Sequence, residues 1–184
     1  MTIERLDIAC GRHFIFRTLI EAGETWQRVR VPNLPVQPET WLALSRLTEE
    51  ILDPIVEQFG PLDMTYGFAS PALTRHVPGR INPLRDQHAG HELRRDGQPI
   101  CSRLGQAVDF KIRGTCSGGV AAWITTHLPF DRLYFYGSEK PLHVSIGPEE
   151  TRAVVTMIEG PSGRRVPQRK ALSWLSDRYE VPPS

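Results

Sequence analysis

The chain has 184 residues, of which 40% are hydrophobic and 23% are charged, and its formal net charge is +1. This length predicts one domain with a single buried core, and the near-neutral charge gives no reason to expect a nucleic acid or an anionic membrane as partner. No apolar run suits a signal peptide or a membrane span, and the three cysteines form no CxxC pair, so we expect a cytoplasmic protein with reduced thiols.

The first half of the chain is predicted to be mainly helical. The clearest helix covers 38–59, although Pro54 removes a backbone donor there and should kink or split it. A short strand is expected over 62–68, and Ser70 and Pro71 indicate the start of another helix. The helix prediction for 38–59 rests on apolar residues that recur at intervals of three and four: Trp41, Leu44, Leu47, Ile51, Ile55 and Phe59.

The second half of the chain is predicted to consist mainly of strands. Residues 75–104 lack apolar periodicity and indicate a long loop, and the basic segment 160–170 indicates a solvated loop rather than a nucleic-acid site. Helices that precede a group of strands predict an α+β fold, with a small antiparallel sheet and helices packed on one side. The expected elements are strands at 107–112, 132–136, 142–146 and 151–158, and helices at 120–127 and 171–179.

Two of these strands each carry one metal-binding side chain within an apolar alternation. Asp109 interrupts the strand 107–112, and His143 interrupts the strand 142–146. Successive side chains of a strand point to opposite faces, so the apolar neighbours should enter the core while Asp109 and His143 face away from it. Either residue alone would suggest only a hydrogen-bonded or solvated polar group. Together, on strands that could be neighbours, they predict a metal site.

A catalytic zinc site needs a third protein ligand and a general base. The long loop offers His88 as the first choice for the ligand and His91 as the alternative, although the same segment also fits a plain polar loop. Glu92 in that loop and Glu139, four residues before His143, are the candidates for the base. Glu139 also fits a simple hairpin turn, which is the more common role of such a segment.

At these residues the chain resembles the zinc D-alanyl-D-alanine carboxypeptidases, whose fold is shared with the hedgehog signalling domain. The family signature SxHxxGxAxD is similar to Gly-Gln-Ala-Val-Asp at 105–109, and the strand motif WVHVS is similar to Leu-His-Val-Ser at 142–145. Residues 66–73 resemble the SGYRSPxxN turn, and 129–133 resemble the segment PFDQL. The order of these motifs along the chain is the order found in the family.

The resemblance covers roughly residues 14–148 and implies a hedgehog/DD-peptidase-like fold. Residues 149–184 would then add a strand, the basic loop and a C-terminal helix within a single domain, 1–184. The family also implies zinc as the cofactor and the hydrolysis of a peptide-like or amide substrate. The implied ligands are His88, Asp109 and His143.

Three positions depart from the family pattern. Strict spacing puts Ser102 where the first zinc histidine belongs, while residues 86–88 (Asp-Gln-His) resemble a displaced SxH. Ala69 stands in place of the family's arginine, and Tyr136 stands in place of its catalytic acid. Two functions are therefore open, a zinc hydrolase with an altered active site and a catalytically degenerate member that binds a ligand or partner. A phage-derived origin is also consistent with the pattern.

Overall fold

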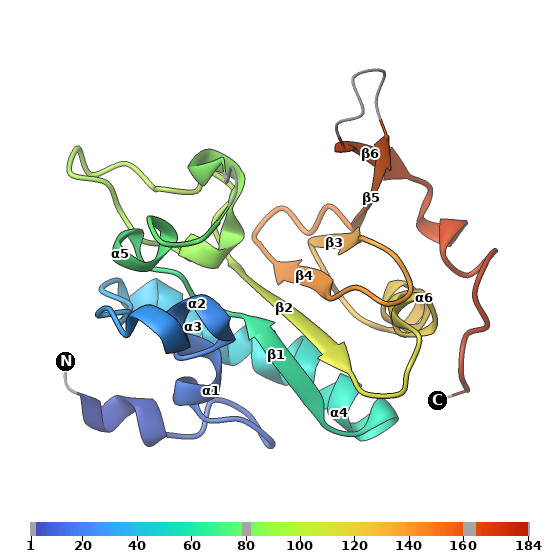
Figure 1. Cartoon of the computed structure of the whole chain (residues 1–184), viewed down its shortest axis with the longest axis horizontal. Helices are drawn as coiled ribbons and strands as arrows, with labels where there is room; N and C mark the ends of the chain where they lie inside the picture. The colour runs from blue at the N-terminus through green and yellow to red at the C-terminus, as the bar shows by residue number, and fades with distance from the viewer. Residues whose placement is uncertain (1–2, 79–81, 160–164, 184) are drawn as a thin grey trace.

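The computed structural model describes residues 3–78, 82–159 and 165–183. Within these residues the strands form one six-stranded sheet in the order β1-β2-β4-β3-β5-β6 (Figure 1). The strands are β1 (Leu62–Tyr66), β2 (Gln106–Ile112), β3 (Arg132–Phe135), β4 (Leu142–Ile146), β5 (Ala153–Glu159) and β6 (Arg165–Lys170).

The sheet is mixed, which corrects the prediction of an antiparallel sheet. Strands β3 and β5 are parallel, whereas the other neighbouring pairs are antiparallel. Strand β4 ends beside the start of β3, and the loop 147–152 carries the chain past this end, so β5 begins there on the other side of β3. The α+β class itself is confirmed.

The predicted helix over 38–59 divides into two helices near Pro54. A π-helical turn, η2 (Thr48–Leu52), joins α3 (Pro38–Leu47) to α4 (Asp53–Phe59). Pro54 has no N–H for the carbonyl group four residues earlier, which explains why the helix widens just before it. The other helices are α1 (Phe16–Ile20), α2 (Gly23–Val29), α5 (Pro71–Thr74) and α6 (Ser117–His127). None of the helices in the described part of the chain is long and apolar enough to cross a membrane.

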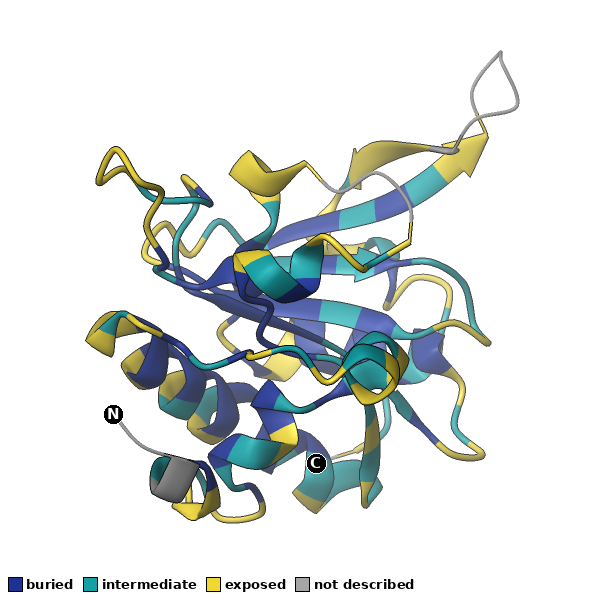
Figure 2. Cartoon of the chain, turned by 60° about the vertical axis from the view of Figure 1, so that its left-hand side comes forward, coloured by how far each residue is buried: buried dark blue, intermediate teal, exposed yellow. Residues whose placement is uncertain are grey.

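The core lies between one face of the sheet and the helices. Apolar side chains of α3, α4 and α6 pack there against Val108, Phe110, Leu142 and Val144, all of which are buried. In Figure 2 the dark blue, buried segments lie in the middle of the sheet and on the helices next to it. These four residues are the neighbours of Asp109 and His143 in sequence, so the predicted alternation is confirmed. The opposite face of the sheet carries Asp109 and His143. It is partly covered by described residues of the long loop, which include the short turns η3 (Pro83–Arg85) and η4 (Gln87–Ala89).

The C-terminal region differs from the prediction. Residues 165–170 form β6 at the edge of the sheet instead of a loop, and residues 160–164 lie outside the described part. Strand β6 was not recognisable because it is exposed and has no apolar alternation. The predicted helix 171–179 is only a 3-10 turn, η5 (Leu172–Trp174), followed by turns that bury Leu175 in the core.

Candidate metal centre

The register of the sheet places the two predicted strand ligands side by side. Asp109 of β2 pairs directly with His143 of β4, and Tyr134 of β3 pairs with His143 on its other side. Tyr66 of β1 pairs with Asp109. Directly paired residues project from the same face of a sheet, so these four side chains form one row on the face away from the core.

His88 reaches this row from η4 in the long loop. Its Nε2 atom lies 3.3 Å from His143 Nδ1 and 3.3 Å from Asp109 Oδ1, and the last two atoms are 2.8 Å apart. A tetrahedral zinc ion with bonds of about 2.0–2.1 Å keeps its ligand atoms about 3.3 Å apart. The three donor atoms therefore have nearly the spacing that a metal ion requires, and the group could hold one.

The tautomer of His88 suits a metal ligand. Its Nδ1 atom lies 2.8 Å from the carbonyl oxygen of Gly67. Because a carbonyl oxygen can only accept, Nδ1 donates this hydrogen bond, and Nε2 of the neutral ring presents a lone pair to Asp109 and His143. Metal-binding histidines commonly donate their second N–H to a carbonyl or carboxylate in this way.

Gln87 fixes the loop that carries His88. It is buried, and its amide nitrogen donates to the carbonyl oxygen of Leu104 at 2.9 Å and to Asp131 Oδ2 at 3.0 Å. Its Oε1 accepts a hydrogen bond from the hydroxyl group of Ser145 at 2.9 Å. Ser145 belongs to the same strand motif as His143, so this motif supplies one proposed ligand and also positions the loop that supplies another.

The charges of the cluster favour a bound cation. Burial would raise the pKa of Asp109, but the neighbouring His88 and His143 hold it well below its usual range, so the carboxylate stays ionised. Burial would lower the pKa of His88, but Asp109 raises it overall. An ionised carboxylate between two imidazoles is a donor set that divalent metals prefer.

A cleft of about 550 Å³ opens over the cluster. All three donor residues line it, and so does Tyr136. Burial is the main cause, and the charge of Asp109 a further one, of a raised pKa for both Tyr66 and Tyr136. Both phenols therefore remain neutral hydrogen-bond donors at neutral pH.

Glu92, one candidate for the base, is not among the residues that line this cleft. Its buried carboxylate accepts hydrogen bonds from the backbone N–H groups of Val36 and Gln37 and from the hydroxyl group of Thr40. Val36 and Gln37 immediately precede α3 and Thr40 lies in its first turn, so Glu92 connects the long loop to the beginning of that helix. Its position next to His91 in the sequence gave no information on the direction of its side chain.

Glu139, the other candidate for the base, lines a different hollow. This hollow of about 500 Å³ also includes Lys111 of β2 and Cys116 and Ser138 near the start of α6. Glu139 lies in the turn between β3 and β4, in agreement with the hairpin interpretation. The structure thus brings neither glutamate into the cleft over the donor atoms.

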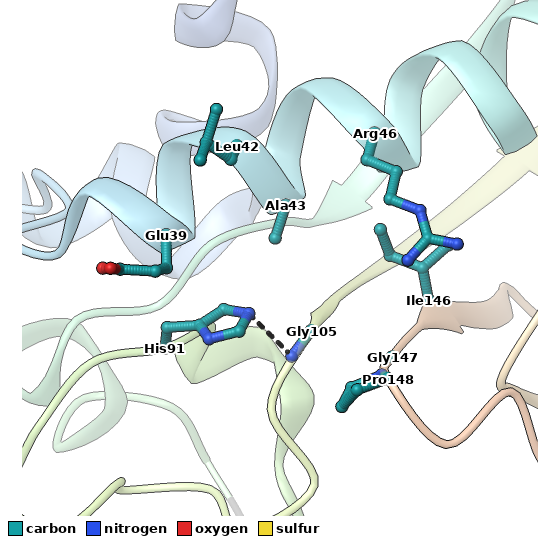
Figure 3. A pocket seen from close by; sticks show the side chains of 9 residues that line it. All are labelled: Glu39, Leu42, Ala43, Arg46, His91, Gly105, Ile146, Gly147 and Pro148. Carbon is teal, nitrogen blue, oxygen red and sulfur yellow. Dashed lines mark hydrogen bonds between the residues drawn. The ribbon is translucent and has the colours of Figure 1, made fainter.

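The alternative ligands His91 and Ser102 also lie outside the cluster. His91 lines a pocket of about 280 Å³ beside α3, where its Nε2 accepts a hydrogen bond from the N–H of Gly105 at 3.1 Å (Figure 3). Ser102 is exposed and donates its hydroxyl proton to the carbonyl oxygen of Leu84 at 3.1 Å. Of the three loop candidates, the structure brings only His88 to Asp109 and His143.

Asp86 is a cleft residue that the sequence reasoning missed. Its Oδ1 accepts a hydrogen bond from the backbone N–H of His88 at 3.2 Å, as the cap of η4. Among the described residues that line the cleft, Asp86 and Asp109 are the only carboxylates. The sequence did offer one indication that Asp86 belongs to the site, because it lies two residues before His88 in the segment that resembles a displaced SxH.

No protein-family model, no curated protein and no solved structure matches the chain. The resemblance to the zinc carboxypeptidases therefore stays a prediction from the motifs.

Proposed function

We propose that the protein binds a zinc ion through His88, Asp109 and His143 and hydrolyses an amide bond in a peptide-like substrate. The observation that carries this proposal is the convergence of three metal-binding atoms within 3.3 Å of one another, at a cleft. Two imidazoles and one carboxylate make a three-ligand set, which leaves the fourth position of a catalytic zinc free for water or substrate. When bound, zinc would act as a Lewis acid toward the substrate carbonyl and would lower the pKa of a coordinated water molecule.

Hydrolysis also needs a group that accepts a proton from water, and Asp86 is the proposed acceptor. It is supported by its position in the cleft and by the hydrogen bond from the N–H of His88, which fixes one of its carboxylate oxygens. Tyr136 is proposed to donate a hydrogen bond to the substrate carbonyl, because its phenol stays neutral and lines the same cleft. Asp86 would then take the role of the family's catalytic acid, which corresponds to position 136, and Tyr136 the role of its arginine, which corresponds to position 69.

The alternative is a cleft that binds a ligand without turnover. One observation favours it: Ala69, which stands where the family has an arginine, is 1% exposed and brings no charged group to the cleft. The two functions share the zinc site and differ only in whether a bond is broken, so turnover distinguishes them.

The metal site is tested by zinc analysis of purified protein after loading and dialysis. We expect about one equivalent in the wild type and a large loss in His88→Ala and His143→Ala. His91→Ala is the matched control, because His91 lies in the same loop and outside the cluster, and it should keep its zinc. Less than about half an equivalent in the wild type, or an unchanged content in His143→Ala, would contradict the proposal.

The proposed proton acceptor is tested with Asp86→Asn, which keeps the hydrogen bond to the N–H of His88 but cannot accept a proton. We expect zinc content to stay near the wild-type value while hydrolysis of peptide or acyl-amide substrates falls by about 100-fold or more. A variant with full zinc and unchanged turnover would exclude Asp86 from this role. Zinc-loaded wild type that hydrolyses no amide or ester would favour the binding function instead.

A further inference from the structure

We propose that the part of the cleft formed by β3, β5 and β6 is a subsite for an apolar side chain of the substrate, and that Met157 sets this preference. The inference rests on the proposed function, because it assumes that the substrate is anchored at the metal cluster. It concerns the hairpin β5–β6, which lies outside the part of the chain that carries the resemblance.

The strand order places this subsite directly beside the proposed ligands. Beyond His143 of β4 comes β3, with Tyr134 on the cleft face and Tyr136 directly after the end of the strand, and then the hairpin β5–β6. Met157 of β5 pairs with Pro167 of β6, and both line the cleft. A substrate held at the cluster would therefore extend over two tyrosines toward a wall made of methionine and proline.

This wall exists because the hairpin β5–β6 extends beyond the end of β3. The pairing of β3 with β5 ends at Phe135 and Thr156, whereas the pairing of β5 with β6 continues as far as Glu159 and Arg165. Met157 is thus the first residue of β5 beyond the last pair with β3, where the hairpin stands free of the rest of the sheet (Figure 1).

The surface of the subsite is mainly apolar, and the Tyr134 ring has an aromatic neighbour on each of two sides. The Tyr134 and Tyr136 rings are nearly parallel, with centroids 6.3 Å apart, and the Tyr134 ring meets His143 edge-on at 5.0 Å. The guanidinium group of Arg103 donates a hydrogen bond to the hydroxyl oxygen of Tyr134 at 3.2 Å, so the polar end of this ring already has a partner.

The charged groups of the cleft other than the cluster come from the loop, namely Arg85, Asp86 and Arg103. The strand side therefore offers aromatic faces, a thioether and a proline ring. An apolar side chain that binds to such a surface leaves water, which makes the free energy of binding more favourable. The flexible methionine can adapt to the shape of that side chain.

Amino-acid hydroxamates test the subsite by binding, without any need for turnover. The hydroxamate group chelates zinc, while the side chain differs among leucine, glycine and aspartate hydroxamate. Dissociation constants are measured by calorimetry on zinc-loaded protein. We expect leucine hydroxamate to bind about tenfold more tightly than glycine hydroxamate, and aspartate hydroxamate to bind least tightly.

Variants of β5 assign the preference to Met157. Met157→Asp should bring the leucine-to-glycine ratio close to one, whereas Met157→Leu should retain it. Ile158→Asp is the matched control, because the next residue of the strand points to the opposite face, and its ratio should equal that of the wild type. The zinc content of each variant confirms that the folded site is intact.

The outcomes separate the two proposals. Zinc-loaded protein that binds all three hydroxamates equally, or a Met157→Asp variant with the wild-type ratio, would overturn the subsite and leave the metal site standing. Protein that retains no zinc and binds none of the hydroxamates would overturn the proposed function, and the subsite with it.

Discussion

Two features of Gly105 exclude a side chain at this position, its backbone conformation and the close approach of another strand. Its φ is +77°, and a Cβ atom would lie 2.0 Å from the carbonyl oxygen of Ile146. This close approach brings the start of β2 against the end of β4, four residues before Asp109 in the sequence. The glycine of the GxAxD-like motif is therefore required by the pairing that sets Asp109 opposite His143.

Gly105→Ala should destabilise the fold by about 2 kcal/mol or more, because it adds a backbone clash to an unfavourable φ. Urea unfolding measures the loss. Gly97→Ala is the matched control, since Gly97 has a φ of +79° but open space around its Cβ position. That variant should lose only about 1 kcal/mol. Equal losses in the two variants would show that the contact with Ile146 has no energetic weight.

Asp109 and His143 were predictable at the level of single residues because strand alternation decides the direction of every side chain. His88 was predicted only as a choice between two histidines three positions apart, since nothing local indicates which of them a loop turns toward a sheet. Asp86 and Glu92 show the same limit. Glu92, the carboxylate nearer to the predicted histidine pair in sequence, binds the backbone just before α3, whereas Asp86, which was overlooked, lines the cleft.

The elements that carry an apolar period were predicted well, and the others were not. The helix over 38–59 and the strands that contain Asp109 and His143 all bury a regular apolar face. Strand β6 buries no such face and owes its position to pairing with β5. The segment 171–179 is too short to hold a helix without packing, and only Leu175 of it is fully buried. The parallel pairing of β3 with β5 depends on the path of a connection, which sequence patterns do not encode.

Glu92 forms a large part of the connection between the long loop and the beginning of α3, next to the hydrogen bond from the N–H of His91 to the hydroxyl group of Thr40. Replacing this residue in Glu92→Gln removes the charge that accepts the hydrogen bonds of Val36, Gln37 and Thr40, and puts an amide N–H₂ group against donors. We expect a loss of about 1–3 kcal/mol in urea unfolding with an unchanged zinc content. Normal stability combined with loss of turnover would instead restore Glu92 as the catalytic base.

At the scale of the whole molecule, one face of the sheet forms the core and the other carries the candidate metal site. One face holds the apolar side chains that pack against the helices, and the other holds the row with Asp109 and His143. The described residues of the loop 75–104 contribute little to the core, and His88 is the loop residue that meets Asp109 and His143. A metal ion bound by all three residues would therefore join the loop to two central strands.

Zinc should accordingly stabilise the fold, through a site that exists only in the native state. At a free zinc concentration 100 times the dissociation constant the gain is about 2.7 kcal/mol, or roughly 5–10 °C in Tm for a chain of this size. Thermal unfolding with zinc and with a chelator measures the shift, which His88→Ala should abolish and His91→Ala should keep. The same shift in both variants would place the stabilising metal elsewhere.

The zinc-dependent shift in Tm should also shrink as the pH falls. Although burial acts to lower the pKa of His88, Asp109 raises it overall, so a proton binds Nε2 of the metal-free protein more tightly than in an ordinary histidine. Below that pKa the proton and zinc compete for the same lone pair, and the protonated pair with Asp109 stabilises the metal-free fold instead. The gain from zinc is therefore complete above the pKa of His88 and is lost below it. Thermal unfolding at a series of pH values, with and without zinc, measures this loss, and a shift that does not change with pH would exclude His88 as a ligand.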